Sequence, residues 1–160
     1  MRPWPEAPDE HGVLVRPAAP GDAAAAHALV CELEGRALYP TSFRKRYRAL
    51  VADDHYLCLV AERDGAVVGV LDVRVERQPH HDLPVAEIIE FVVDAGERGR
   101  GLGARMFGVA CELARERGCE LIEVHSRRDR TRAHGFYEGL GMSPTHVHLT
   151  MSLDRDGGNR

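Results

Sequence analysis

Four glycines fall within one nine-residue segment in the second half of the chain, Gly96-Glu97-Arg98-Gly99-Arg100-Gly101-Leu102-Gly103-Ala104. The segment follows an apolar run and precedes an amphipathic one, so we expect it to join a strand to the start of a helix. A helix N-terminus carries unpaired backbone N–H groups and a partial positive charge, and glycines let a phosphate approach that backbone closely. The pattern therefore indicates a site for a phosphorylated ligand.

Several kinds of site share this pattern. A P-loop would need Gly-Lys-Ser/Thr, which is absent. A dinucleotide fingerprint usually opens the first βαβ unit, with an acid about 20 residues further on. Here Glu120 and Glu123 have roughly that spacing, but the segment lies past mid-chain and the first βαβ unit is missing. A loop for the pyrophosphate of coenzyme A and a tight turn without a ligand are the alternatives that remain.

The elements around the segment predict an α/β fold, with a mixed sheet and helices on its faces. The expected strands are 12–16, 56–62, 67–77, 85–93, 121–125 and 145–151. The expected helices are 22–34, 42–51, 102–117 and 131–140. Their order is β-α-α-β-β-β-α-β-α-β, in a single domain over residues 12–152. Residues 1–11 and 154–160 are expected to be loose termini.

Composition excludes several classes of protein. A chain of 160 residues, 44% of them apolar, fits one domain with a hydrophobic core. Its net charge of −4 offers no overall basic field for nucleic acid. The absence of a long apolar run and of a signal-peptide core predicts a soluble, cytoplasmic protein that does not bind membranes. The four cysteines show no CxxC or zinc-like spacing, so we expect reduced thiols and no metal.

Two motifs resemble the GNAT superfamily of N-acetyltransferases. Arg98-Gly99-Arg100-Gly101-Leu102-Gly103 is similar to the family's Arg/Gln-x-x-Gly-x-Gly/Ala signature. Ala133–Met142 resembles its second hallmark, a helix ending in Phe-Tyr-x-x-x-Gly, although Met142 stands where an aromatic residue is commoner. Leu29–Leu33, the His80-His81 loop and Glu87–Val93 are similar to aminoalkylphosphonate N-acetyltransferases in particular.

This resemblance implies a GNAT fold and direct transfer of acetyl from acetyl-CoA to a primary amine of a small molecule. Tyr137 matches the position of the family's general acid, and its phenol is protonated at neutral pH. An oxyanion donor is expected from the backbone near Phe91–Val93. The residues implied to bind the cofactor are Phe91, Val92, Val93, Arg98, Gly99, Arg100, Gly101, Leu102, Gly103, Ala104 and Phe136.

An ammonium acceptor also needs a base, and Glu90 is the first candidate because it precedes the stretch expected to pair with pantetheine. Regular alternation would place Glu90 with Ile88 and Val92, on a partly apolar face that raises a carboxyl's pKa. Glu87 is the rival. It would lie on the other face of a regular strand, and a bulge would change that phase.

The acceptor itself stays open. The basic run Arg44-Lys45-Arg46 with Arg48 favours an anionic group on the acceptor. The arginine-rich segment 127–132 is a candidate contact for the coenzyme A phosphates or for an anionic acceptor, with a solvated loop as the alternative. Glu32, Glu34, Asp53 and Asp54 favour a cationic acceptor instead. A peptide α-amine and a non-catalytic acetyl-CoA sensor are alternative functions, and the resemblance also implies a possible homodimer.

Overall fold

The computed structural model describes residue 4 and residues 7–153, so most of the expected loose termini lie outside the described residues. It divides the chain into two compact units, Met1–Val124 and His125–Arg160. The first unit holds the sheet and three α-helices, and the second holds one α-helix.

The first unit is built on a five-stranded sheet in the order β1-β2-β3-β4-β5. The strands are β1 (Val13–Pro17), β2 (Tyr56–Arg63), β3 (Ala66–Glu76), β4 (Val85–Val93) and β5 (Leu121–Val124). Pairs from β1 to β4 are antiparallel, and β5 runs parallel to β4. Such a parallel pair needs a crossover, which the helix between β4 and β5 provides.

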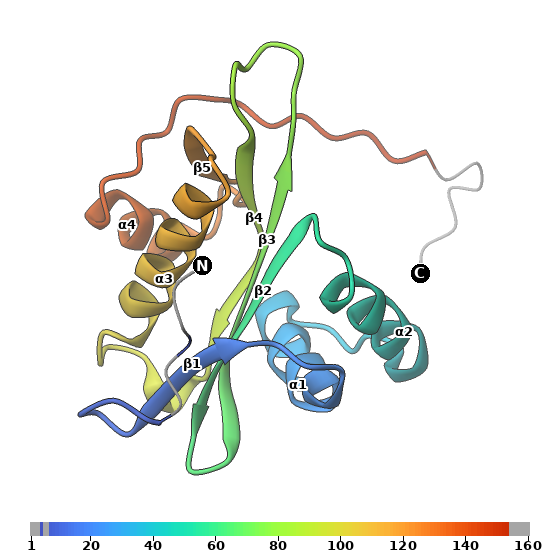
Figure 1. The fold of residues 1–160 in the computed structure, drawn as a ribbon. Coiled ribbons are helices and arrows are strands. Elements are labelled where there is room, and N and C mark those ends of the chain that lie inside the picture. Colours follow the sequence, from blue (N-terminus) through green and yellow to red (C-terminus); the bar gives the residue numbers. More distant parts are fainter. Residues whose placement is uncertain (1–3, 5–6, 154–160) are drawn as a thin grey trace. The chain divides into compact units, whose positions relative to one another are not determined.

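Helices cover both faces of this sheet (Figure 1). The two helices α1 (Ala23–Glu34) and α2 (Pro40–Val51) lie on one face, and the crossover helix α3 (Leu102–Glu116) lies on the other. Alanines and leucines on one side of α1 pack against Val60, Val70 and Val92 of the sheet. In the described part of the chain, no helix has the length and apolar character to cross a membrane.

Gly69 of β3 allows α3 to approach the sheet closely. A Cβ atom at this position would lie 2.8 Å from Met106 Sδ and 3.3 Å from Ala61 Cβ. Met106 is fully buried, so it has little room to move. From Gly69 to Arg74, the odd-numbered residues of β3 therefore face α3, and the even-numbered ones face α1 and α2.

Among its described residues, the second unit contains helix α4 (Thr131–Gly139) and the irregular segment 142–153. The predicted strand at 145–151 is wrong, because residues 142–153 form neither helix nor strand. Val147, Leu149 and Met151 are 71–86% exposed. Alternating polarity predicts a strand only when a neighbouring strand supplies hydrogen bonds, and no described strand pairs with this segment.

A polar cluster lies inside the face covered by α1 and α2. Asp72 of β3 is 4% exposed and accepts a hydrogen bond from the Cys58 thiol on β2. Burial raises the pKa of Asp72 to about 6, although the Cys58 bond opposes this shift. Tyr47 of α2 is also 4% exposed, and burial raises the pKa of its hydroxyl, as does the nearby Asp72 charge.

The raised pKa of Asp72 makes a testable prediction about stability. The folded state holds this proton more tightly than the unfolded chain, so the contribution of Asp72 to stability is fully present below about pH 4 and is lost as the pH rises through about 6. Asp72→Asn removes the ionisation. We expect it to raise the free energy of unfolding at pH 7 by up to about 3 kcal/mol and to leave it unchanged at pH 4.

Urea unfolding of both proteins at pH 4 and pH 7 measures this difference. Asp82→Asn is the matched control, because Asp82 is exposed in the β3–β4 loop. An Asp72→Asn variant that loses stability at pH 7 would show that the buried carboxylate is stabilised by its surroundings.

Candidate active site

The glycine-rich segment forms the predicted turn between β4 and α3. A short 3-10 turn (Ala95–Glu97) follows β4, and α3 begins after Gly101. Gly99 and Gly101 have φ values of +77° and +79°, which other residues rarely adopt. A Cβ atom at either position would meet nothing within 4 Å. Glycine is therefore required here by the positive φ angle and not by a lack of space.

This backbone aims a group of N–H donors out of the helix. The first hydrogen bond of α3 runs from the Arg105 N–H to the Gly101 carbonyl at 3.1 Å. The N–H groups of Gly101, Leu102, Gly103 and Ala104 therefore precede the first turn and have no partner within the helix. No described side chain caps them. The arrangement suits an anion, which the positive end of the helix dipole also favours.

Arg98 holds the turn to its surroundings. Its Nε donates to the Val93 carbonyl at 2.9 Å, and a terminal nitrogen donates to Glu32 Oε1 at 2.6 Å. The guanidinium thus ties the turn both to the end of β4 and to α1. These contacts give Arg98 a role in shaping the turn, which its position in the motif alone did not indicate.

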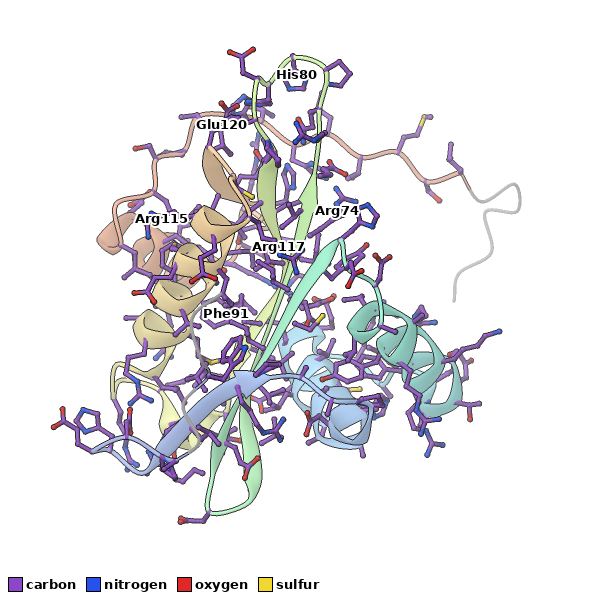
Figure 2. All side chains as sticks on the ribbon, viewed as in Figure 1. Arg74, His80, Phe91, Arg115, Arg117 and Glu120 are labelled. Atoms are coloured by element: carbon purple, nitrogen blue, oxygen red, sulfur yellow. The ribbon has the colours of Figure 1, made fainter. Side chains whose placement is uncertain are left out.

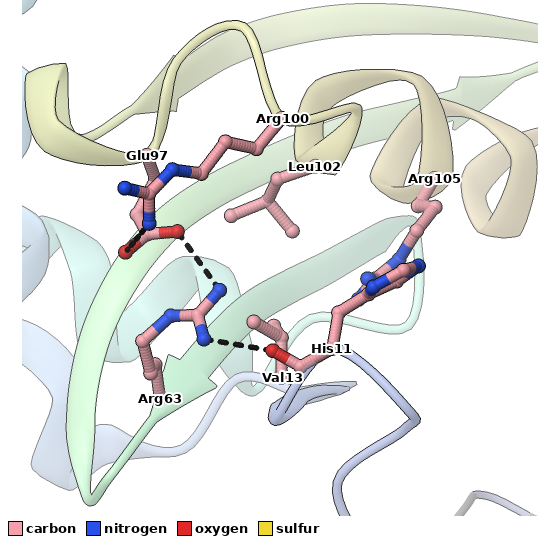
Figure 3. A pocket seen from close by; sticks show the side chains of 7 residues that line it. All are labelled: His11, Val13, Arg63, Glu97, Arg100, Leu102 and Arg105. Carbon is pink, nitrogen blue, oxygen red and sulfur yellow. Dashed lines mark hydrogen bonds and ion pairs between the residues drawn. The ribbon is translucent and has the colours of Figure 1, made fainter.

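Glu97 anchors the turn on the side of β1 and β2. It is 8% exposed and accepts from Arg63 at 3.0 Å, while Arg100 lies 3.8 Å away. Figure 3 shows these side chains around a pocket of about 320 Å³ that Arg105 also lines. The Arg100 side chain therefore points toward this pocket, and the Leu102 side chain is only 2% exposed. Both residues can therefore bind a ligand at the turn chiefly through their backbone groups.

A β-bulge in β4 determines which carboxylates share a face. Glu90 pairs with Asp72 and Ile88 pairs with Val73, which leaves Ile89 as the extra residue. Glu87 pairs with Arg74 and forms an ion pair with it at 2.5 Å. Arg74 lies near the middle of the sheet in Figure 2.

Two expectations change because of this bulge. Opposed residues in an antiparallel pair share a face, so Asp72, Glu87 and Glu90 all point toward the side of α1 and α2. Glu87 does not lie on the opposite face, and Ile88 does not share the face of Glu90. The expected apolar neighbour of Glu90 is therefore replaced by a second and a third carboxyl group.

The pairing of β4 with β5 ends at the same bulge. β5 pairs with β4 only from Val85 to Ile88, where Val124 is the last partner. Beyond this point the segment 90–93 keeps its ladder with β3. Phe91, which Figure 2 labels within this stretch, and Val93 face α3, and Val92 packs against α1. The expected pantetheine-pairing stretch is thus the part of β4 that β5 leaves uncovered.

Tyr137 and Phe136 lie on α4 in the second unit. Their rings meet edge to face with centroids 5.2 Å apart. Burial raises the pKa of Tyr137 to about 12, and the Arg130 charge opposes this shift. The phenol is therefore protonated at every ordinary pH and is able to donate a proton.

The histidine loop has a structural contact. His81 pairs with Glu120, which precedes β5, and its ring lies beside that of His80 with centroids 4.6 Å apart. His80 stands at the tip of the β3–β4 loop (Figure 2). Among the described residues, no group of three histidines, cysteines or acids is placed to hold a metal ion.

Asp72 is the site residue that sequence reasoning missed. The available signal was one acid in the otherwise apolar run 67–73, where burial of an ionisable group is costly. Its neighbours could not be predicted, because they come from α2, β2 and β4.

Comparisons with known proteins agree with this geometry. The Acetyltransferase (GNAT) family model matches residues 23–142. An aminoalkylphosphonate N-acetyltransferase of Salmonella typhimurium is 33% identical over 139 residues, covering 87% of this chain and 90% of that protein. A solved structure described as a transcriptional regulator from Bacillus halodurans has a TM-score of 0.82 at 26% identity and covers 88% of this chain and 99% of its own.

A likeness of fold alone extends further. An aminoglycoside acetyltransferase from a soil metagenome has a TM-score of 0.79 at 20% identity, covering 91% of this chain and 99% of its own. The mixed-sheet fold predicted from the order of the elements is therefore confirmed, as is the resemblance to the GNAT superfamily. The chain belongs to the GNAT family and is an N-acetyltransferase.

Proposed function

We propose that this enzyme transfers acetyl from acetyl-CoA to the primary amine of a small molecule that also carries an anionic group. The family implies the use of acetyl-CoA. The observation that carries the proposal is the turn before α3, where left-handed glycines leave backbone N–H groups open to a phosphate. The thioester supplies the activated acetyl group, and the chain's own residues bind, orient and exchange protons.

The proposed coenzyme site runs along one edge of β4. Backbone groups of Arg98–Ala104 grip the pyrophosphate, and Phe91–Val93 pair with the pantetheine amides beyond the end of β5. An N–H group of the same strand stabilises the oxyanion as it forms. Phe136 is a further proposed cofactor-binding residue, by its place in the family motif.

Glu90 is the proposed base. The bulge sets it on the acceptor face with Glu87, but Glu87 already forms an ion pair with Arg74 at 2.5 Å. A carboxylate held by an arginine is a weaker proton acceptor, because the positive charge stabilises its ionised form. Tyr137 is the proposed acid that protonates the departing thiolate, and its pKa of about 12 keeps the phenol protonated at neutral pH.

The exposed face of α2 supports an acceptor with a negative group. Its cations Arg44, Lys45, Arg46 and Arg48 are exposed, and in the described part of the chain none has an acidic partner. The Salmonella relative is named for an aminoalkylphosphonate, which joins an amine to an anionic head. A similar acceptor would place its anion on α2 and its nitrogen near Glu90.

A thiol-release assay across amine classes tests this substrate class. With acetyl-CoA fixed, we expect turnover with aminoalkylphosphonates and other amines that carry an anionic group, and much less with aminoglycosides, polyamines or N-terminal peptides. A preference for polyamines or peptides would contradict the proposed acceptor. Saturable acetyl-CoA binding without thiol release from any amine would contradict the enzymatic role.

Gly101→Asp should weaken coenzyme A binding. The substitution puts a carboxylate beside the N–H donors and forces an unfavourable backbone at φ +79°, so we expect Kd to rise at least about tenfold, or roughly 1.4 kcal/mol. Calorimetry measures this effect. Gly108→Asp is the matched control, since it adds the same charge at an exposed position on the same helix. Equal affinities for the two variants would remove the phosphate assignment.

Tyr137→Phe should lower kcat by about 100-fold while leaving the Kd for acetyl-CoA unchanged, because the ring stays and only the proton donor is lost. Steady-state kinetics and calorimetry separate the two effects. Tyr39→Phe, at an 85% exposed tyrosine, serves as the control. An unchanged kcat in Tyr137→Phe would mean that another group protonates the thiolate.

A further inference from the structure

The buried Asp72 on β3 is the cross-strand neighbour of Glu90, the proposed base. Asp72 and Glu90 are opposed residues of an antiparallel pair, so their side chains rise from the same face of the sheet about 5 Å apart at the backbone. On the other side, Asp72 is opposed by Cys58. Asp72 therefore stands between a base candidate and a thiol that acts as a donor to it.

Two polar atoms in this place have no protein partner. Asp72 Oδ1 and the Tyr47 hydroxyl are both buried, and neither has a hydrogen bond among the described residues. A buried polar atom without a hydrogen bond destabilises the folded state. A single internal water can donate to the carboxylate oxygen and accept from the phenol, which would satisfy both atoms.

Titratable side chains face Asp72 from α2, β2 and β4. Tyr47 faces it from α2, Cys58 from β2 and Glu90 from β4. The ion-paired Asp22 and Arg16 also lie near Tyr47, where Asp22 raises the pKa of the hydroxyl and Arg16 lowers it. Arg74, two residues after Asp72 on β3, forms its ion pair with Glu87. No described cation pairs with Asp72 itself, so its ionised form stays expensive.

The proposed reaction needs a place for one proton. An ammonium acceptor loses two protons when it becomes an amide. One proton ends on the thiol of coenzyme A, and the other is a net product of the reaction. In the proposed mechanism Glu90 accepts the proton that is released as a net product, and it does so before the nitrogen attacks. Glu90 must then lose this proton before the next catalytic cycle.

We propose that Asp72 is a positioning residue for proton transfer, which receives the acceptor's proton from Glu90 through a water held between Asp72 Oδ1 and the Tyr47 hydroxyl. In the first step the N–H bond of the ammonium breaks and Glu90 becomes a carboxylic acid. The proton then moves through the water to the Asp72 carboxylate, which restores the Glu90 carboxylate. The proton returns to solvent after the products leave. This inference rests on the proposed function.

Kinetics of Asp72→Asn test the relay. We expect kcat to fall at least about tenfold, with both KM values unchanged, because binding is intact and only proton transfer is impaired. In the wild type kcat should rise as the pH passes about 6, where Asp72 ionises, and the variant should lose this limb. An unchanged kcat and pH profile would overturn the proposal.

Two further variants separate a relay from a structural role. In a Glu90→Gln background, Asp72→Asn should cause no further loss of kcat, because the two groups act in series. Independent, multiplying losses would overturn the relay. Tyr47→Phe keeps the ring and removes the hydroxyl, and we expect a smaller fall of kcat in the same direction. Asp82→Asn should behave as the wild type.

A crystal structure at atomic resolution tests the water without an assay. We expect one water within hydrogen-bond distance of both Asp72 Oδ1 and the Tyr47 oxygen. A direct Asp72–Tyr47 hydrogen bond, or an apolar contact in its place, would overturn the proposal even if the enzyme is active. If the water is present but the wild type acetylates no amine, the proposed function fails and the relay fails with it.

Discussion

The backbone between Gly99 and Gly101 is the constraint on which the proposed site depends. Both glycines are left-handed, and only this conformation brings the chain from β4 into α3 with the first N–H groups of the helix exposed. Other contacts hold that conformation in place. Arg98 joins the turn to α1 and to the end of β4, and Glu97 joins it to β2 through Arg63. The protein's own side chains thus hold the backbone of the proposed anion site in place.

The bulge at Ile89 is a second constraint with several consequences. One extra residue reverses the phase of β4, so that Glu87 and Glu90 share with Asp72 the face covered by α1 and α2. The ladder with β5 stops at the same residue, which opens the edge proposed for pantetheine. Arg74 then distinguishes the two glutamates by binding Glu87. A single irregularity therefore positions both the proposed base and the edge proposed for pantetheine.

Features that depend on local residue types could be predicted from the sequence. The Asp64-Gly65 hairpin, the glycine turn and the long amphipathic α3 each have strong local signals, and each is present. The bulge, the ion pairs of Arg98 and the surroundings of Asp72 depend on strand register and on residues far away in the chain. The strand predicted at 145–151 is wrong for a related reason, because alternating polarity contains no information about a partner strand.

The most direct test of the account follows the backbone amides of the turn while coenzyme A is added. In ¹⁵N-resolved NMR spectra, we predict that the amide signals of Gly99–Ala104 shift and saturate together, while those of the β2–β3 hairpin at Asp64 and Gly65 stay in place. Folded protein whose turn signals do not respond to coenzyme A or acetyl-CoA would contradict the claim that these N–H groups bind the pyrophosphate.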